Sequence, residues 1–157
     1  AAARTGLRPD DNRGRIVDND SSKVAVVSLS GEFGVKEIYV GREEDIAEGG
    51  RKVIAVDGDE IGVFRVDGSL YAWKNHCPHQ GGPICQGRLI KGVEERLDSE
   101  QRSLGIHYAE GKLHVVCPWH GYEFDVKTGR HAGISSVRLA SYPVKQRDGD
   151  VYVVVRS

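Results

Sequence analysis

Two short stretches of the chain combine cysteine and histidine with proline and glycine. The first is NHCPHQGGPICQG at residues 75–87, and the second is VCPWHGYEFD at residues 116–125. Thiolates and imidazoles are the usual protein ligands of zinc and of some iron–sulfur clusters. Within the two stretches, Cys77-x-His79 and Cys117-x-x-His120 each offer one thiolate and one imidazole at a spacing short enough for both to reach one metal site. The candidate ligands are Cys77, His79, Cys117 and His120.

Two kinds of centre could take one thiolate and one imidazole from each of two loops. One is a tetrahedral Cys2His2 zinc ion that stiffens the fold. The other is a [2Fe–2S] cluster with two cysteines on one iron and two histidines on the other. Structural zinc usually serves domains too small to fold alone, and zinc fingers usually group like ligands together. Gly81, Gly82 and Gly121 let backbone N–H groups approach sulfur closely, which favours the cluster while zinc stays open as the alternative.

Loops of this kind need a frame, and the rest of the sequence predicts an all-β one. Asp57-Gly58 and Asp67-Gly68 are each flanked by β-branched or aromatic residues, which is the strongest short-range signal for a β-hairpin. A short strand is expected at 23–28 and a helical turn around 43–47. Residues 1–22 are polar and are interpreted as a flexible N-terminal arm, and residues 23–157 as a single domain.

One segment departs from the β pattern. Within residues 92–106, Val93, Leu97 and Leu104 stand near helical spacing with charges between them. Arg96 and Glu100 could pair at i, i+4. The pattern predicts a short surface helix within an insertion at about 88–112, carried by a small antiparallel β sandwich or barrel.

Composition excludes several classes of protein. A chain of 157 residues suits one domain, and a net charge of −1 does not indicate binding to nucleic acid or to an anionic membrane. Three cysteines cannot all pair, so a disulfide framework is not expected. No apolar run approaches the roughly 18 residues of a membrane helix, and the N-terminus lacks the apolar core of a secretory signal. The expected location is therefore the reducing cytoplasm.

The two motifs together resemble the Rieske [2Fe–2S] family. CPHQGGP followed by CPWHGYEFDVKTG matches the family's paired motifs, and the resemblance extends over about residues 36–156. It implies three stacked antiparallel sheets, a small cluster-binding subdomain and one [2Fe–2S] cluster per chain. In that family the inner iron would be held by Cys77 and Cys117, and the outer iron by His79 and His120.

The insertion is a departure from the family pattern. Family members commonly have a shorter segment between the first histidine and the second cysteine than residues 80–116 of this chain. Loop length adds little to closure entropy, roughly 0.6 kcal/mol per doubling, so the cluster is expected to tolerate it. The insertion could shape a docking surface or could be a solvated excursion with no role.

The motif is close to that of ferredoxin components and oxygenase N-terminal domains, which implies an electron carrier. Such a Rieske-type ferredoxin would pass single electrons from a flavin-dependent reductase to a terminal oxygenase, with no catalytic centre of its own. An oxygenase subunit would need a further domain with a mononuclear iron, and only Arg156 and Ser157 follow the final strand. The alternatives are a small Rieske subunit of an oxidoreductase complex and a zinc-stabilised interaction module.

The resemblance also gives an expectation for the reduction potential. Two neutral imidazoles leave an oxidised cluster uncharged, so Rieske potentials lie at roughly −150 to +300 mV. High-potential relatives carry a serine, a tyrosine and a disulfide near the cluster, where this chain has Tyr122, Phe124, Gly82 and Trp119. A potential near the lower end, about −150 mV, is therefore expected.

Four other positions carry expectations of their own. Cys85 is expected to be buried and inert, and His114 to face solvent from a strand. Trp119 is expected to pack over the site, and residues 131–134 could form a third loop that covers it.

Overall fold

The computed structural model describes residues 26–27 and 34–156. The predicted N-terminal arm at 1–22 lies outside the described residues, as does most of the strand expected at 23–28. The strands are β1 Val26–Val27, β2 Val35–Arg42, β3 Arg51–Val56, β4 Asp59–Val66, β5 Ser69–Lys74, β6 Arg88–Leu97, β7 Ser103–Val116, β8 Glu123–Asp125, β9 Ser141–Tyr142, β10 Val144–Arg147 and β11 Asp150–Arg156.

Helical structure in the described residues is limited to two single 3-10 turns. The first, η1, spans Glu43–Asp45 and confirms the helical turn expected there. The second, η2, spans Ile84–Gln86 at the end of the first cysteine stretch. No helix in this part of the chain has the length and apolarity that a membrane span requires.

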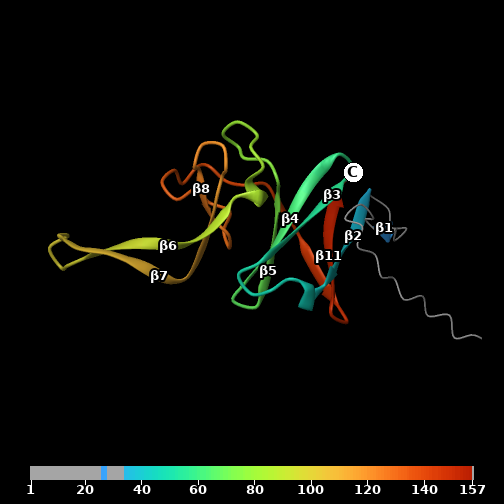
Figure 1. The fold of residues 1–157 in the computed structure, drawn as a ribbon, viewed down its shortest axis with the longest axis horizontal. Coiled ribbons are helices and arrows are strands. Elements are labelled where there is room, and N and C mark those ends of the chain that lie inside the picture. Colours follow the sequence, from blue (N-terminus) through green and yellow to red (C-terminus); the bar gives the residue numbers. More distant parts are fainter. Residues whose placement is uncertain (1–25, 28–33, 157) are drawn as a thin grey trace, which may run out of the picture.

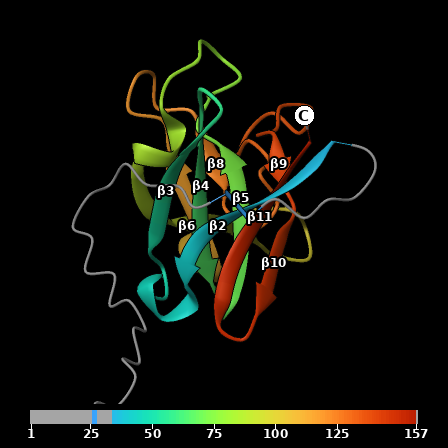
Figure 2. The same ribbon diagram turned by 90° about the vertical axis from the view of Figure 1, so that its right-hand side faces the viewer.

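The strands form three antiparallel sheets, as expected. Their strand orders are β1-β2-β11-β10, β3-β4-β5-β9 and β6-β7-β8. Figure 2 shows the sheet of β2, β11 and β10 lying across the sheet of β3, β4 and β5. The third sheet carries the second cysteine stretch, because β7 ends at Val116 and β8 begins at Glu123.

The middle sheet is buried on both faces. On β4, Ile61 and Val63 belong to the core shared with the β2–β11 sheet, whereas Phe64 and Val66 belong to the core shared with the β6–β8 sheet. Alternate side chains of a strand point to opposite faces, so one strand serves both cores. Burying each such side chain contributes about 1.5–3 kcal/mol, which makes this sheet a rigid base for the loops.

Both predicted Asp-Gly hairpins are confirmed. Asp57 and Gly58 join β3 to β4 with φ of 49° and 89°, and Asp67 and Gly68 join β4 to β5 with φ of 50° and 72°. Positive φ at both central residues defines a type I′ turn, whose twist matches that of paired strands.

The helix predicted for residues 92–106 is wrong. This segment belongs to β6 and β7, which pair as a long antiparallel hairpin with Val93 opposite Tyr108 and Glu95 opposite Ile106. We call the outer part of this hairpin, residues 92–112, the arm. Figure 1 shows the arm projecting away from the rest of the molecule, on the side opposite β1 and β2.

A turn between the strands explains why the helix does not form. The Asp98 carboxylate accepts the backbone N–H groups of Glu100 and Arg102 at 2.8 and 2.9 Å, which closes a tight turn. Gln101 and Gly105 take φ of 64° and 100°, which a helix does not allow. Arg102 also pairs with Glu100 at 2.9 Å, in place of the expected Arg96–Glu100 pair.

Candidate metal centre

The two cysteine loops have the same backbone turn. The Cys77 N–H donates to the Gly82 carbonyl, and the Cys117 N–H donates to the Tyr122 carbonyl, each at 2.8 Å. The first loop follows β5 and the second connects β7 to β8, and the two lie next to each other at one end of the molecule (Figure 1). Two separate parts of the sequence therefore present their cysteines in equivalent positions.

A glycine completes each turn. Gly81 and Gly121 donate their N–H groups to the carbonyls of Cys77 and Cys117 at 2.8 and 3.0 Å. Their φ angles are 80° and 73°, a left-handed conformation that side chains with a Cβ rarely adopt. The glycines of the two motifs are thus required by the turns that hold the cysteines.

The four predicted ligands come together as two pairs. Cys77 and Cys117 are 1% and 2% exposed, and their thiols lie within hydrogen-bonding reach of each other. The rings of His79 and His120 are exposed at the rim, with centroids 4.8 Å apart and planes at 87°. The thiols are therefore on the inside of the site and the imidazoles on the outside.

Backbone N–H groups are directed at the sulfur of Cys77. Burial raises the pKa of the Cys77 thiol, and the neighbouring Cys117 thiol acts in the same direction. The backbone N–H groups of His79 and Gln80 act against this, because they donate to the sulfur and favour the thiolate. Such N–H groups are what a metal-bound thiolate requires to offset its loss of water.

The two loops approach each other closely beside the Cys117 sulfur. A Cβ at Gly82 would lie 2.8 Å from the Cys117 sulfur and 3.0 Å from the Trp119 ring, so only glycine leaves this approach open. Two adjacent thiols and two adjacent imidazoles match the ligand set of a [2Fe–2S] cluster of the Rieske type. Among residues 34–156, no three or more His, Cys, Asp or Glu side chains converge on one ion position. A two-iron cluster requires only two protein ligands on each iron, so a group of three or more around one position is not needed.

Aromatic rings surround the outer pair. Tyr122 stacks on His79 with ring centroids 4.2 Å apart and planes at 8°. His131 meets the Tyr122 ring at 4.8 Å, which confirms that the 131–134 segment forms a third loop at this site. Trp119 lies edge-on to His120 at 6.4 Å, yet it is 58% exposed and so covers the site only partly.

The third cysteine is separate from the ligand pairs. Cys85 is fully buried, and its sulfur lies 3.5 Å from the Trp73 carbonyl. Burial raises the pKa of the Cys85 thiol to about 12. This confirms the expected burial and makes Cys85 a poor nucleophile at neutral pH.

The expectation that His114 faces solvent is wrong. His114 is only 8% exposed. Its Nδ1 contacts the Glu123 carboxylate, and its Nε2 lies 3.7 Å from the Asp125 carboxylate. The reason is that β8 pairs alongside β7 and places Asp125 directly opposite His114. The alternating acids of EFD were the sequence signal that could have revealed this contact.

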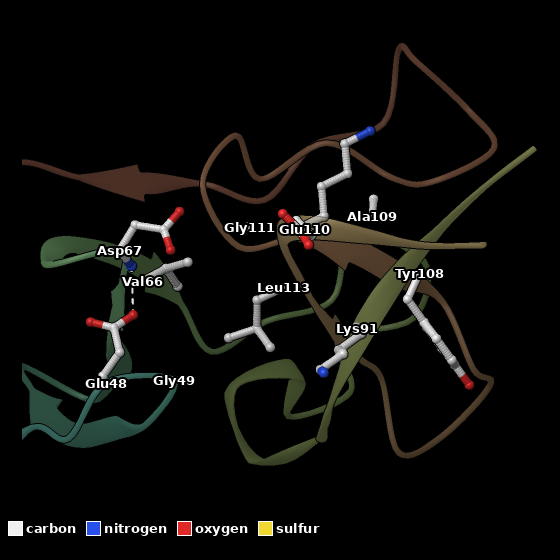
Figure 3. Close-up of a pocket in the computed structure, with 11 residues that line it drawn as sticks. Glu48, Gly49, Val66, Asp67, Lys91, Tyr108, Ala109, Glu110, Gly111 and Leu113 are labelled. Atoms are coloured by element: carbon white, nitrogen blue, oxygen red, sulfur yellow. Dashed lines mark hydrogen bonds between the residues drawn. The ribbon is translucent and has the colours of Figure 1, made fainter. Parts of the chain in front are cut away.

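A cavity of about 360 Å³ lies elsewhere, between the base of the arm and the end of β4 (Figure 3). At its edge the Glu48 carboxylate accepts the backbone N–H groups of Asp67 and Gly68, which fixes the β4–β5 turn. The cavity is lined by Glu48, Gly49, Val66, Asp67, Lys91, Tyr108, Ala109, Glu110, Gly111, Lys112 and Leu113. None of the four candidate ligands is among them, so the paired loops remain the candidate site.

Comparison with protein families identifies a domain that contains both loops. The family model described as the Rieske [2Fe-2S] domain matches residues 36–143. The match includes both cysteine loops and the whole arm between them. It also covers more than half of the chain.

Individual relatives agree with the family match. The chain is 30% identical over 112 residues to the ferredoxin component of the naphthalene 1,2-dioxygenase system of Pseudomonas putida, covering 71% of this chain and 88% of that protein. It is 25% identical over 122 residues to a 3-phenylpropionate/cinnamic acid dioxygenase ferredoxin subunit of Photorhabdus laumondii, covering 77% and 96%. Among solved structures, the ferredoxin of carbazole 1,9a-dioxygenase from Nocardioides aromaticivorans aligns with a TM-score of 0.52 at 24% identity, covering 74% and 95%, which supports the fold.

Proposed function

The chain belongs to the Rieske [2Fe-2S] domain family, and from this premise we propose that it is a Rieske-type ferredoxin. It carries single electrons through one [2Fe–2S] cluster from a flavin-dependent reductase to a terminal oxygenase. The observation that carries this proposal is the 30% identity to a dioxygenase ferredoxin component, of which the alignment covers 88%. The wider proposal is that residues 23–157 form one Rieske domain and that residues 1–22 form a separate N-terminal segment before it.

The proposed ligands are Cys77, His79, Cys117 and His120. When bound, the cluster supplies a centre that accepts and releases one electron. The buried thiols of Cys77 and Cys117 would hold it away from water, with backbone N–H groups of the first loop directed at the Cys77 sulfur. The exposed rings of His79 and His120 would hold the cluster from its solvent side. They are the natural point of exit for the electron toward a docked partner.

We also propose that the protein works in the reducing cytoplasm. Cys77, Cys85 and Cys117 are all free thiols. In an oxidising compartment exposed or paired thiols tend to form disulfides, whereas a cluster needs its two cysteines reduced before assembly. The low content of cysteine fits a protein that relies on its sheets and not on disulfides for stability.

The test is anaerobic loading with iron and sulfide, followed by visible absorption and electron paramagnetic resonance (EPR) spectroscopy. We expect a red-brown protein with two irons and two sulfides per chain, and a paramagnetic signal only after reduction. Adding the loaded protein to a dioxygenase system that lacks its ferredoxin should restore product formation. A colourless protein that binds zinc instead would overturn the cluster. A red protein that no reductase reduces would overturn the carrier role.

A further inference from the structure

The two loops differ at one equivalent position. The last residue of each turn, whose carbonyl accepts the cysteine N–H, is Gly82 in the first loop and Tyr122 in the second. Each of these residues faces the opposite loop. Gly82 leaves its space to the Cys117 sulfur and the Trp119 ring, whereas Tyr122 places a ring against His79.

The two outer imidazoles are therefore supported unequally. His79 has the Tyr122 ring flat against one face, with centroids 4.2 Å apart and planes at 8°. The aromatic contact of His120 with its own loop is the edge-on ring of Trp119 at 6.4 Å. A ring stacked on one face restricts rotation of the imidazole about its bond to Cβ, whereas a distant edge restricts it little.

The third loop holds Tyr122 in place. The His131 ring meets Tyr122 at 4.8 Å, with planes at 65°. His131 is itself fixed, because its Nδ1 accepts the backbone N–H groups of Gly133 and Ile134, both at 3.0 Å. The backbone N–H of His131 donates to the Val137 carbonyl at 3.0 Å. Tyr122 thus lies between a ring anchored by backbone hydrogen bonds and the imidazole of His79.

We propose that Tyr122 is a positioning residue for His79, and that His131 acts through Tyr122 to hold that imidazole in one orientation. The proposal rests on the proposed cluster, in which His79 and His120 are the two histidine ligands. The orientation of an imidazole about its bond to iron alters the overlap between the orbitals of the ring and those of the iron. Residues that contact a metal ligand from outside set that orientation. The consequence is that the His79 ring is held more firmly than the His120 ring, whose ring contacts are edge-on, with Trp119 and with His79 itself.

The test compares Tyr122→Leu with Tyr122→Phe in the cluster-loaded protein. Pulsed EPR spectroscopy of the reduced protein reports a separate nitrogen coupling for each histidine ligand. Tyr122→Phe keeps the stacked ring, and both couplings should match the unaltered protein. Tyr122→Leu removes the ring, and we expect one coupling to shift and broaden while the other stays unchanged. Two unchanged couplings, or two that change equally, would overturn the proposal.

His131→Asn provides a second, gentler variant. The Asn side-chain oxygen can take the place of His131 Nδ1 as acceptor for Gly133 and Ile134, so the loop is kept while the ring against Tyr122 is lost. We expect the same coupling to broaden, by less than in Tyr122→Leu. If Tyr122→Leu does not take up a cluster, unchanged couplings in His131→Asn overturn the proposal. Failure of the cluster itself would appear in the unaltered protein, which separates the two cases.

Discussion

The imidazole rings of His79 and His120 meet edge to face, with centroids 4.8 Å apart, although the whole β6–β7 hairpin separates them in sequence. The contact depends on the matching backbone turns at Cys77 and Cys117, which present the two histidines to each other. A substitution at the rim should therefore alter the chemistry of the site without dismantling the turns.

Replacing His120 with cysteine tests the outer ligands. A thiolate adds a negative charge where a neutral imidazole stood, so reduction becomes harder. We expect His120→Cys to keep a cluster with a potential shifted downward, toward the roughly −400 mV of all-cysteine plant-type ferredoxins. Spectroelectrochemical titration measures the shift. His76→Ala is the control, because His76 is an exposed histidine beside Cys77 in the first loop and has no proposed ligand role; a lost cluster in that variant would contradict the assignment.

Cys117 and Cys85, two of the three buried cysteines, should respond differently to the same substitution. Cys117→Ala removes an inner ligand and should abolish the cluster absorption. Cys85→Ala should keep it, because Cys85 contacts the Trp73 carbonyl in the core and not the other thiols. The cost of Cys85→Ala should be about 1 kcal/mol of unfolding free energy. Iron and sulfide content per chain distinguishes the outcomes, and a fully red Cys117→Ala protein would show that the ligands are wrongly assigned.

The potential should be low because the described site lacks one hydroxyl donor of high-potential relatives. Phe124 stands where those relatives have a tyrosine, and it is fully buried in the core that contains Cys77 and Cys117. We expect a midpoint near about −150 mV, and a rise in Phe124→Tyr if the new hydroxyl donates to sulfur. Redox titration of both proteins tests this. A midpoint above roughly +100 mV in the unaltered protein is the result that would contradict the expectation.

Sequence reasoning succeeded where local chemistry decides the structure. Asp57-Gly58 and Asp67-Gly68 favour their turns through positive φ, and no distant contact is needed. The turns of the two cysteine loops depend on Gly81 and Gly121 in the same way, so the positions of the candidate ligands could be predicted from the two motifs.

Sequence reasoning failed where pairing between distant strands determines the structure. The spacing of Val93 and Leu97 allowed a helix, but pairing with Tyr108 and Ser103 on the other strand made it a hairpin. The burial of His114 follows from the placement of β8 beside β7, a pairing that the residues on either side of His114 do not determine. The stacking of Tyr122 on His79 likewise depends on how two loops meet.

The arm should be dispensable for the cluster. Lys91 and Leu113 are opposite each other across β6 and β7, so an Asn-Gly turn could join them directly in place of residues 92–112. Shortening the connection between the two strands lowers the entropic cost of closing it and leaves the core of the sheet intact. We expect the same cluster absorption and midpoint potential as in the unaltered protein. Loss of the cluster in this shortened protein would show that the arm supports the loops.

If the arm docks a partner, shortening it should slow electron transfer while the spectra stay the same. The arm exposes a set of large apolar side chains, which are Val93, Leu97, Leu104, Ile106 and Tyr108. Rates with a reductase and an oxygenase, measured on both proteins at equal cluster content, separate a docking surface from a solvated excursion. Equal rates with both partners would favour the excursion.

Glu37 should make the β2–β10–β11 sheet sensitive to acid. Glu37 is 7% exposed, accepts a hydrogen bond from Lys145 Nζ at 2.7 Å and pairs with Arg147. The hydrogen bond from Lys145 lowers the pKa of Glu37 from 4.5, against the opposing effect of burial, and Arg147 adds to the lowering. A lowered folded-state pKa means that the ion pairs stabilise the protein fully above pH 4.5 and lose that contribution as the pH falls through the folded value.

Glu37→Gln should therefore destabilise the protein most near neutral pH. The difference in unfolding free energy from the unaltered protein should stay constant from about pH 7 to about pH 5 and shrink in more acidic solution. Urea unfolding followed by circular dichroism at several pH values measures it. Glu44→Gln is the control, because that side chain is 80% exposed and lies 3.9 Å from Arg42; it should change stability little at any pH. A Glu37→Gln difference that persists undiminished at about pH 3 would mean that packing, and not charge, is what Glu37 contributes.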